Sequence, residues 1–128
     1  MYLPYADEYY YKDIYSGEIV PDDELSKALR QTSRHIDSLT YNRIVGRGFF
    51  NLTEFQQDLI KEVCCLQADF EYENKELIEN VLSSYSINGV SMWLESGWNI
   101  HADEGVAIKK EVYSLVAQTG LCCRLLRW

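Results

Sequence analysis

Apolar residues recur every three or four positions in three long stretches of the chain, which is the pattern of helices with one buried face. The first stretch begins at Pro21, and proline is tolerated at the first position of a helix. Its apolar positions are Leu25, Ala28, Leu29, Ile36 and Leu39. We expect a helix that begins at Pro21 and fades near Tyr41-Asn42, followed by a loop at Gly46-Arg47-Gly48.

The second stretch begins after Asn51 or Thr53, and either residue type can cap the first turn of a helix. Its apolar positions are Phe55, Leu59, Val63, Leu66 and Phe70. We expect this helix to end near Tyr72. The charged segment 71–80 either continues the helix or breaks it around Asn74.

The third stretch predicts a final helix that starts at Asp103-Glu104 and stops at Thr119-Gly120, because glycine commonly ends a helix. Its apolar positions are Val106, Ile108, Val112, Leu115 and Val116. The residues before it, Gly97 to His101, are expected to form a connector. A short helix is also expected near the N-terminus, from Ala6 to Tyr15.

Between the second and third stretches the apolar pattern changes its period from helical spacing to strict alternation. Ser84 to Ile87 and Val90 to Trp93 alternate polar with apolar residues, and Asn88-Gly89 stands between them. Asn-Gly between two alternating runs predicts a β-hairpin, because the turn needs positive φ at both central residues. An isolated hairpin is marginal in water, so it must pack on the helices or on another subunit.

These elements predict a mostly α fold, a small helical bundle of about three or four helices with one β-hairpin around residues 84–93. A chain of 128 residues is long enough to close one modest hydrophobic core. We therefore expect a single domain over residues 1–128, with residues 121–128 as a C-terminal tail. This tail is apolar and basic, so we expect either the domain or a partner to cover it.

The net charge of −8 makes the chain strongly acidic. Such a chain repels phosphate backbones, which argues against an independent role in binding nucleic acid. No apolar run approaches the roughly 20 residues of a membrane-spanning helix, and residues 1–8 lack the basic-then-apolar order of a signal peptide. We therefore expect a soluble protein, made in the cytosol, with no membrane partner.

Candidate catalytic and metal-binding patterns are scarce in the sequence. The two histidines, His35 and His101, stand beside no nucleophile motif, and we interpret them as surface or helix-end residues. Cys64-Cys65 and Cys122-Cys123 are adjacent pairs, and neighbouring helical residues point about 100° apart, so a pair cannot chelate a metal as Cys-x-x-Cys does. We interpret these cysteines as small apolar residues and expect no enzyme activity, catalytic residue, cofactor or metal.

Tyrosine is concentrated at the start of the chain, at Tyr2, Tyr5, Tyr9, Tyr10, Tyr11 and Tyr15. Its large apolar ring and polar tip suit a surface that is covered by a partner. The same rings could instead pack the N-terminal helix onto its own domain. The sequence leaves both interpretations open.

Three segments stand in an order that is typical of one protein family. The first is Tyr5-Ala6-Asp7 through Tyr10-Tyr11, with Gly17 and then Ile19-Val20-Pro21. The second runs from Ala28-Leu29 to Ile44 and contains Ile36-Asp37, Thr40 and Arg43-Ile44 in the spacing I-D-x-x-T-x-x-R-I. The third combines the expected hairpin, Ser86 to Met92, with the closing helix and Thr119 to Arg124. In this order the segments resemble the small head-tail connector, or adaptor, proteins of long-tailed bacteriophages and prophages. Cys123 and Leu125 replace an aromatic residue and a glycine of the family's ending.

The resemblance implies a structural virion protein, made in the bacterial host cytoplasm and located at the head-tail interface. About a dozen copies would form a homo-oligomeric ring that binds beneath the portal protein and leaves a channel for the genome. Its partners would be copies of itself, the portal protein, and tail-side connector or tail terminator proteins. Genomic DNA would pass through the channel without specific binding.

Two groups of residues are the candidate contacts with neighbouring subunits or the portal, because neither the hairpin nor the tail is expected to be stable alone. They are Tyr85, Ile87, Val90, Met92 and Trp93 of the hairpin, and Leu121, Leu125, Leu126 and Trp128 of the tail. An alternative of a different class is a small acidic regulatory or inhibitor protein that binds one host protein. The alternative predicts a monomer or dimer with a single partner instead of a many-membered ring.

Overall fold

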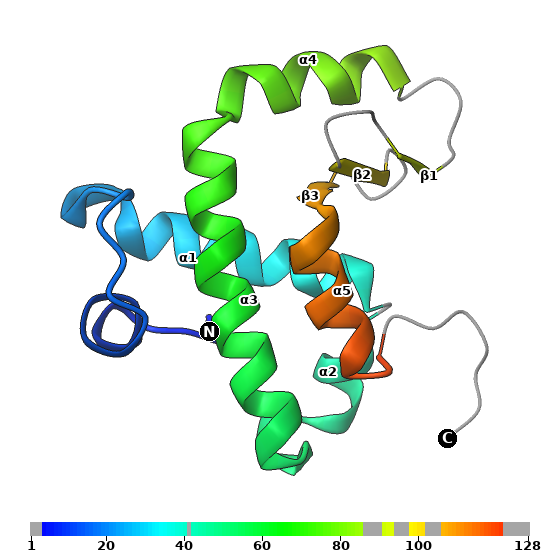
Figure 1. The fold of residues 1–128 in the computed structure, drawn as a ribbon. Coiled ribbons are helices and arrows are strands. Elements are labelled where there is room, and N and C mark those ends of the chain that lie inside the picture. Colours follow the sequence, from blue (N-terminus) through cyan, green and yellow to red (C-terminus); the bar gives the residue numbers. More distant parts are fainter. Residues whose placement is uncertain (1–3, 41, 86–90, 94–97, 102–105, 122–128) are drawn as a thin grey trace.

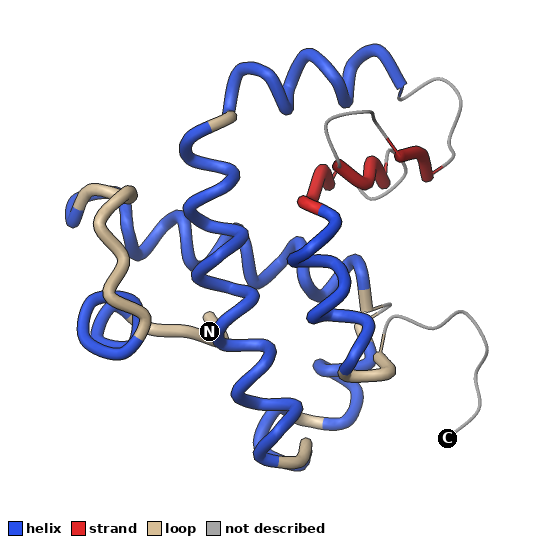
Figure 2. Tube along the Cα trace, in the orientation of Figure 1, coloured by secondary structure: helices blue, strands red, loops and turns tan. Residues whose placement is uncertain are grey.

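The computed structural model describes residues 4–40, 42–85, 91–93, 98–101 and 106–121. Their elements are the π-helix η1 (Tyr10–Ile14), α1 (Asp22–Leu39), α2 (Arg43–Arg47), the 3-10 helix η2 (Phe49–Asn51), α3 (Glu54–Glu73), α4 (Lys75–Tyr85), β1 (Ser91–Trp93), β2 (Trp98–His101), β3 (Val106–Lys109) and α5 (Lys110–Gln118). The fold is mostly helical and bundle-like, as the sequence predicted. Figure 2 shows the short strands gathered at one end of the helices.

The central element is α3, which is crossed by α1 on one side and flanked by α5 on another (Figure 1). The core forms where the three helices meet. Its buried side chains include Leu25, Leu29 and Ile36 from α1, Ile60, Val63, Cys64 and Ala68 from α3, and Val112 and Val116 from α5. The apolar spacing read from the sequence therefore predicted which faces of these helices are buried. Phe55 is an exception, because its ring is exposed at the first turn of α3.

Polar residues and a glycine mark the ends of α3 and α5. Thr53 caps α3 through a capping box, in which its side chain accepts a hydrogen bond from the Gln56 N–H at 3.1 Å and the Gln56 side chain accepts one from the Thr53 N–H at 3.1 Å. Asn74 separates α3 from α4, and its Nδ2 donates to the Phe70 carbonyl at 3.0 Å. At the end of α5, Gly120 has a φ of 75°, which glycine adopts without strain.

The three strands form an antiparallel sheet in the order β1-β2-β3. The expected strand at 91–93 is present, but its partner is different from the one predicted. Ser84 and Tyr85 end the eleven-residue helix α4, and β1 pairs with β2, in the register Met92 to Ile100. Four alternating residues cannot compete with the continuing amphipathic helix that precedes them. The Asn88-Gly89 turn lies outside the described residues.

Two other boundaries differ from the prediction. Val106–Lys109 is the strand β3, paired with β2, so the last helix begins at Lys110. Val106, Ala107 and Ile108 are buried, and the backbone of this segment pairs with β2 in the register Ile100 to Ala107. The expected loop at residues 46–48 begins later, because α2 continues to Arg47. None of the helices in the described part of the chain has the length and apolar character needed to cross a bilayer.

Candidate functional site

The N-terminal segment is fastened to α3 by hydrogen bonds between tyrosine and aspartate. The Tyr11 hydroxyl donates to Oδ1 of Asp69 at 2.5 Å, and the Tyr15 hydroxyl donates to Oδ2 of the same carboxylate at 2.8 Å. The Tyr11 hydroxyl also accepts the Val20 N–H at 3.0 Å. Tyr11 and Asp69 are both buried, so this network pairs a carboxylate that would otherwise be costly to bury.

The environment makes these two hydroxyls harder to deprotonate than the hydroxyl of an exposed tyrosine, because it raises their pKa. Burial raises the pKa of Tyr11 to about 12, and the hydrogen bond to Asp69 adds to the effect. Burial and Asp69 raise the pKa of Tyr15 in the same direction. Hydroxyls that hold their protons so tightly act as fixed donors, which suits a structural anchor better than proton transfer.

A second anchor holds the beginning of the segment over α1. The Tyr5 N–H donates to Oγ of Ser33 at 3.0 Å, and the Tyr5 hydroxyl donates to the Asp37 carboxylate. The Tyr5 ring stacks on Phe49, with 5.2 Å between the ring centroids. Phe49 in turn meets the edge of Phe50 at 5.4 Å. The N-terminal segment and η2, far apart in the sequence, are thereby brought together.

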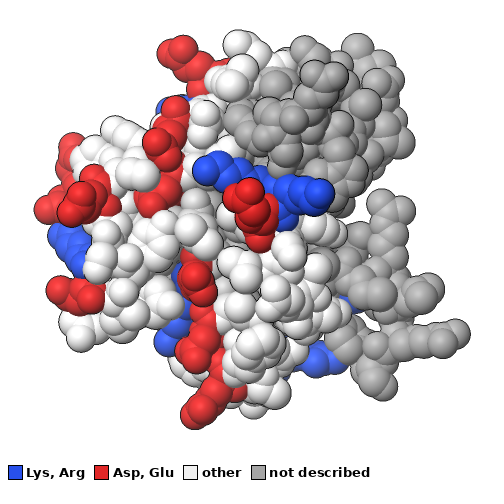
Figure 3. Space-filling model, in the orientation of Figure 1, with Lys and Arg blue, Asp and Glu red and all other residues white. Residues whose placement is uncertain are grey.

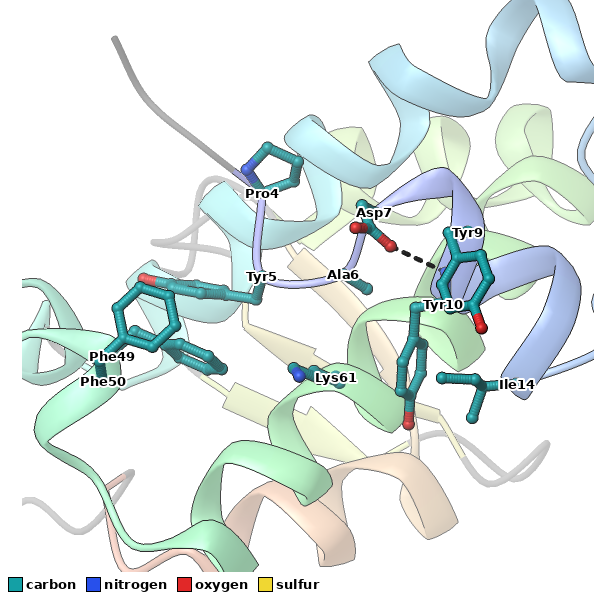
Figure 4. A pocket seen from close by; sticks show the side chains of 10 residues that line it. All are labelled: Pro4, Tyr5, Ala6, Asp7, Tyr9, Tyr10, Ile14, Phe49, Phe50 and Lys61. Carbon is teal, nitrogen blue, oxygen red and sulfur yellow. Dashed lines mark hydrogen bonds between the residues drawn. The ribbon is translucent and has the colours of Figure 1, made fainter.

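An open pocket of about 410 Å³ lies between the N-terminal segment, η2 and α3. Figure 4 shows two groups of side chains on either side of Lys61, which comes from α3. One group is Tyr5, Phe49 and Phe50, and the other is Tyr9, Tyr10 and Ile14. We call this site the aromatic pocket. Its volume lies in the range of pockets that accept ligands or the anchor side chains of partners.

Large apolar side chains are exposed at the mouth of the aromatic pocket. Phe50 is 87% exposed, Tyr9 65% and Ile14 59%. Single exposed apolar residues are ordinary on protein surfaces, but several around one pocket mark a site of interaction. The anchors at Asp37 and Asp69 hold the walls in place, so a partner would meet a preformed surface and lose less conformational entropy on binding.

The charged side chains that line the aromatic pocket are Asp7 and Lys61. Oδ1 of Asp7 accepts the Tyr10 N–H at 2.8 Å. Burial raises the pKa of Tyr10, and the nearby Cys65, Glu62 and Asp58 raise it further. Lys61 is the basic member of the wall, with its Nζ 5.8 Å from the centroid of the Tyr10 ring. Figure 3 shows carboxylate side chains spread over one face, from α4 to the beginning of α3.

His35 belongs to a polar network that joins α1, α3 and β3. Its Nδ1 lies 2.6 Å from Oε2 of Glu71, which also accepts a hydrogen bond from Nε2 of Gln67 at 2.8 Å. Nε2 of Gln67 donates to the Ala107 carbonyl at 2.7 Å as well. His35 therefore ties three elements together from within α1, and it is only partly exposed.

Cys64 and Cys65 are buried in the core, as the sequence predicted. Burial raises the pKa of Cys64 to about 11 and also raises that of Cys65, which keeps both thiols protonated and unreactive. Among the described residues, no group of three or more histidine, cysteine or acidic side chains is placed to hold a metal ion. Cys122 and Cys123 lie outside the described residues.

The residues predicted as contacts divide into three sets. Tyr85 ends α4, and Met92 and Trp93 lie in β1. Ile87, Val90, Leu125, Leu126 and Trp128 lie outside the described residues. The prediction that Leu121 contacts a neighbouring subunit is wrong, because its side chain is buried in the chain's own core. Its carbonyl accepts a hydrogen bond from Nη1 of Arg43 at 3.1 Å. The turn at Gly120 directs the chain back toward the helices, which places Leu121 inside.

Sequence reasoning left the role of the N-terminal tyrosines open, and the structure divides them. Tyr11 is buried in the domain, whereas Tyr9 is exposed at the aromatic pocket. Ile14 and Phe50 were missed as surface candidates. The adjacent pair Phe49-Phe50, outside any apolar stripe, was the available signal, because an aromatic residue outside a helix pattern has no obvious place in the core.

Comparison with known proteins adds no relative from which a role could be inferred. No protein-family model matches the chain, and no curated protein or solved structure gives a significant match. The features of this chain that bear on its function are the aromatic pocket, the net charge and the order of the segments.

Proposed function

We propose that this chain is a structural virion protein, a subunit of the ring that connects the portal of a phage head to the tail. The aromatic pocket is the observation that carries the proposal. The first segment of the family resemblance, Tyr5 to Tyr11, supplies side chains to both sides of this pocket, Tyr5 on one and Tyr9 and Tyr10 on the other. A subunit that assembles with its neighbours needs such a preformed apolar surface, which an isolated domain has no reason to keep in water.

Ring assembly requires two different patches on each subunit, because each copy offers one patch to the complementary patch of the next. The aromatic pocket supplies one of them. Met92 and Trp93 of β1 remain candidates for contacts with the portal or with a neighbouring subunit, as do Leu125, Leu126 and Trp128 of the tail.

The charge of the chain supports the passage of DNA without binding. A net charge of −8 repels the phosphate backbone, so a channel lined by such subunits would let the genome slide. Partners would be copies of this chain, the portal protein, and tail-side connector or tail terminator proteins. In this proposal the protein acts through its shape and contacts, with no catalytic step.

Light scattering across a concentration series, with negative-stain electron microscopy of the same samples, tests this proposal. We expect growth into closed rings of about a dozen copies, in line with a closed heterologous assembly. The Trp93→Asp variant should reduce assembly if β1 lies at a contact, while Leu77→Asp, at an exposed position of α4, serves as the matched control. A stable dimer that never grows would instead favour the small acidic regulator that binds one host protein.

A further inference from the structure

We propose that the aromatic pocket of one copy receives the C-terminal tail of a second copy. The tail, residues 122–128, is Cys122-Cys123-Arg124-Leu125-Leu126-Arg127-Trp128. This inference deepens the proposed function, because it names the partner that the pocket binds. Only the closure of the ring rests on the proposed function; the contact between two copies does not. The occupant is a second copy of this chain, and its leucine and tryptophan side chains fill the pocket.

The apolar chemistry of the tail matches that of the pocket. Leu125, Leu126 and Trp128 are large apolar side chains within four residues of one another. The pocket offers aromatic walls, open at the mouth, with Phe50 and Tyr9 largely exposed. A tryptophan or leucine that enters an aromatic pocket is the usual anchor of a protein interface.

Charge is complementary as well. The tail carries Arg124 and Arg127 and contains no acidic side chain, in a chain whose net charge is −8. Asp7 lines the pocket and accepts the Tyr10 N–H, and Asp58 and Glu62 lie near enough to Tyr10 to raise its pKa. The arginines of the tail can pair with these carboxylates, while Lys61 is the basic side chain of the pocket lining.

The geometry favours the tail of a neighbour over the chain's own tail. The end of α5 rests on the first turn of α3, where Nε2 of Gln56 donates to the Thr119 carbonyl at 2.9 Å. The pocket is lined by Lys61, five residues further along α3 and therefore about 140° around that helix. Figure 1 shows the N-terminal segment and the end of α5 on opposite sides of α3. Because α5 ends on one side of α3 and the N-terminal wall of the pocket lies on the other, binding of the tail by a second copy would give a head-to-tail contact, the type that closes into rings.

Two full-length variants test this contact by complementation. Phe50→Asp disables the pocket at a side chain that is 87% exposed, so the fold should tolerate it. Leu126→Asp disables the tail. We expect each variant alone to remain monomeric, because every contact needs one intact pocket and one intact tail. An equimolar mixture should form a dimer of one copy of each and grow no further, since that dimer retains only a disabled pocket and a disabled tail.

Sedimentation velocity measures the masses, and circular dichroism confirms that both variants are folded. Phe55→Asp is the matched control, an exposed phenylalanine that lies outside the pocket lining, and it should associate like the unmodified chain. Raising the salt concentration should weaken the mixed dimer, because the arginine-carboxylate attraction is screened. A mixture that stays monomeric at every concentration up to the solubility limit overturns the proposal, and so do single variants that assemble like the unmodified chain.

The two proposals fail in different ways. If both single variants still form closed rings of about a dozen copies, the tail contact is wrong and the connector proposal stands. If the mixed dimer forms but the unmodified chain builds only open filaments or dimers, the tail contact is supported and the connector proposal fails.

Discussion

Gly17 lies directly against the ring of Tyr11, and a Cβ atom at residue 17 would stand 2.2 Å from Cζ of that ring. The Gly17 N–H also donates to the Tyr11 carbonyl at 2.8 Å, which fixes the backbone in this position. Tyr11 in turn is held by Asp69 and Val20. The absence of a side chain at residue 17 is therefore what allows the N-terminal segment to close over the buried tyrosine.

Gly17→Ala should destabilise the protein. The added methyl group cannot fit without moving the Tyr11 ring, and overpacking of this kind costs about 1–3 kcal/mol. The free energy of unfolding, measured in urea by circular dichroism, should fall by that amount. Gly46→Ala is the matched control, because a Cβ at residue 46 meets nothing within 4 Å. Residue 46 lies in α2, where alanine is more favourable than glycine by up to about 1 kcal/mol. Equal effects at the two glycines would contradict the close contact.

Removing the Tyr11 hydroxyl should cost stability while leaving the ring in place. Tyr11→Phe leaves the Val20 N–H without this acceptor and Asp69 without one of its donors, a loss of about 1–3 kcal/mol for buried polar groups. Tyr9→Phe, at a ring that is 65% exposed, should change the free energy of unfolding by less than about 0.5 kcal/mol. If both variants unfold at the same urea concentration as the unmodified chain, the hydrogen-bond network contributes nothing.

Stability should fall at alkaline pH through the same tyrosine. The pKa of Tyr11 is raised in the folded chain from 10.0 to about 12, so between these values the folded state holds a proton that the unfolded state releases. The contribution of Tyr11 is complete below pH 10 and is lost as the pH rises through about 12, with a slope of at most about 1.4 kcal/mol per pH unit. Tyr11→Phe should flatten this slope in urea titrations at several pH values. A slope unchanged by the substitution would show that other groups cause the alkaline loss.

Thr53→Ala should weaken the start of α3 by about 1 kcal/mol, because the capping hydrogen bond to the Gln56 N–H is lost. Thr53→Ser keeps the hydroxyl and should retain most of the stability. Gln56→Glu separates two roles of that side chain, since glutamate can complete the capping box but cannot donate to the Thr119 carbonyl. Calorimetry of the three variants gives their thermal midpoints and checks these expectations. A Thr53→Ala variant that unfolds at the same temperature as the unmodified chain would contradict the role of the cap.

The sequence alone determined the helices and their buried faces. Leu25, Leu29 and Ile36 recur at helical spacing and are buried in α1, and Gly120 ends α5 because its positive φ suits glycine. These features follow from local periodicity and from backbone preferences, which need no knowledge of the rest of the chain. Cys64 and Cys65 were likewise placed correctly as buried residues, since they fall within an amphipathic helix.

The tertiary structure decided the pairing of the strands and the position of the aromatic pocket. Strand β1 pairs with β2, whereas Ser84 and Tyr85 belong to α4. Val106 to Ile108 form a strand because β2 lies beside them, a contact that no local pattern records. The pocket joins Tyr9 and Ile14 to Phe50 and Lys61, residues that are distant in the sequence. The anchors to Asp37 and Asp69 hold the N-terminal segment in place, and these long-range hydrogen bonds determine which tyrosines are buried and which remain exposed at the pocket.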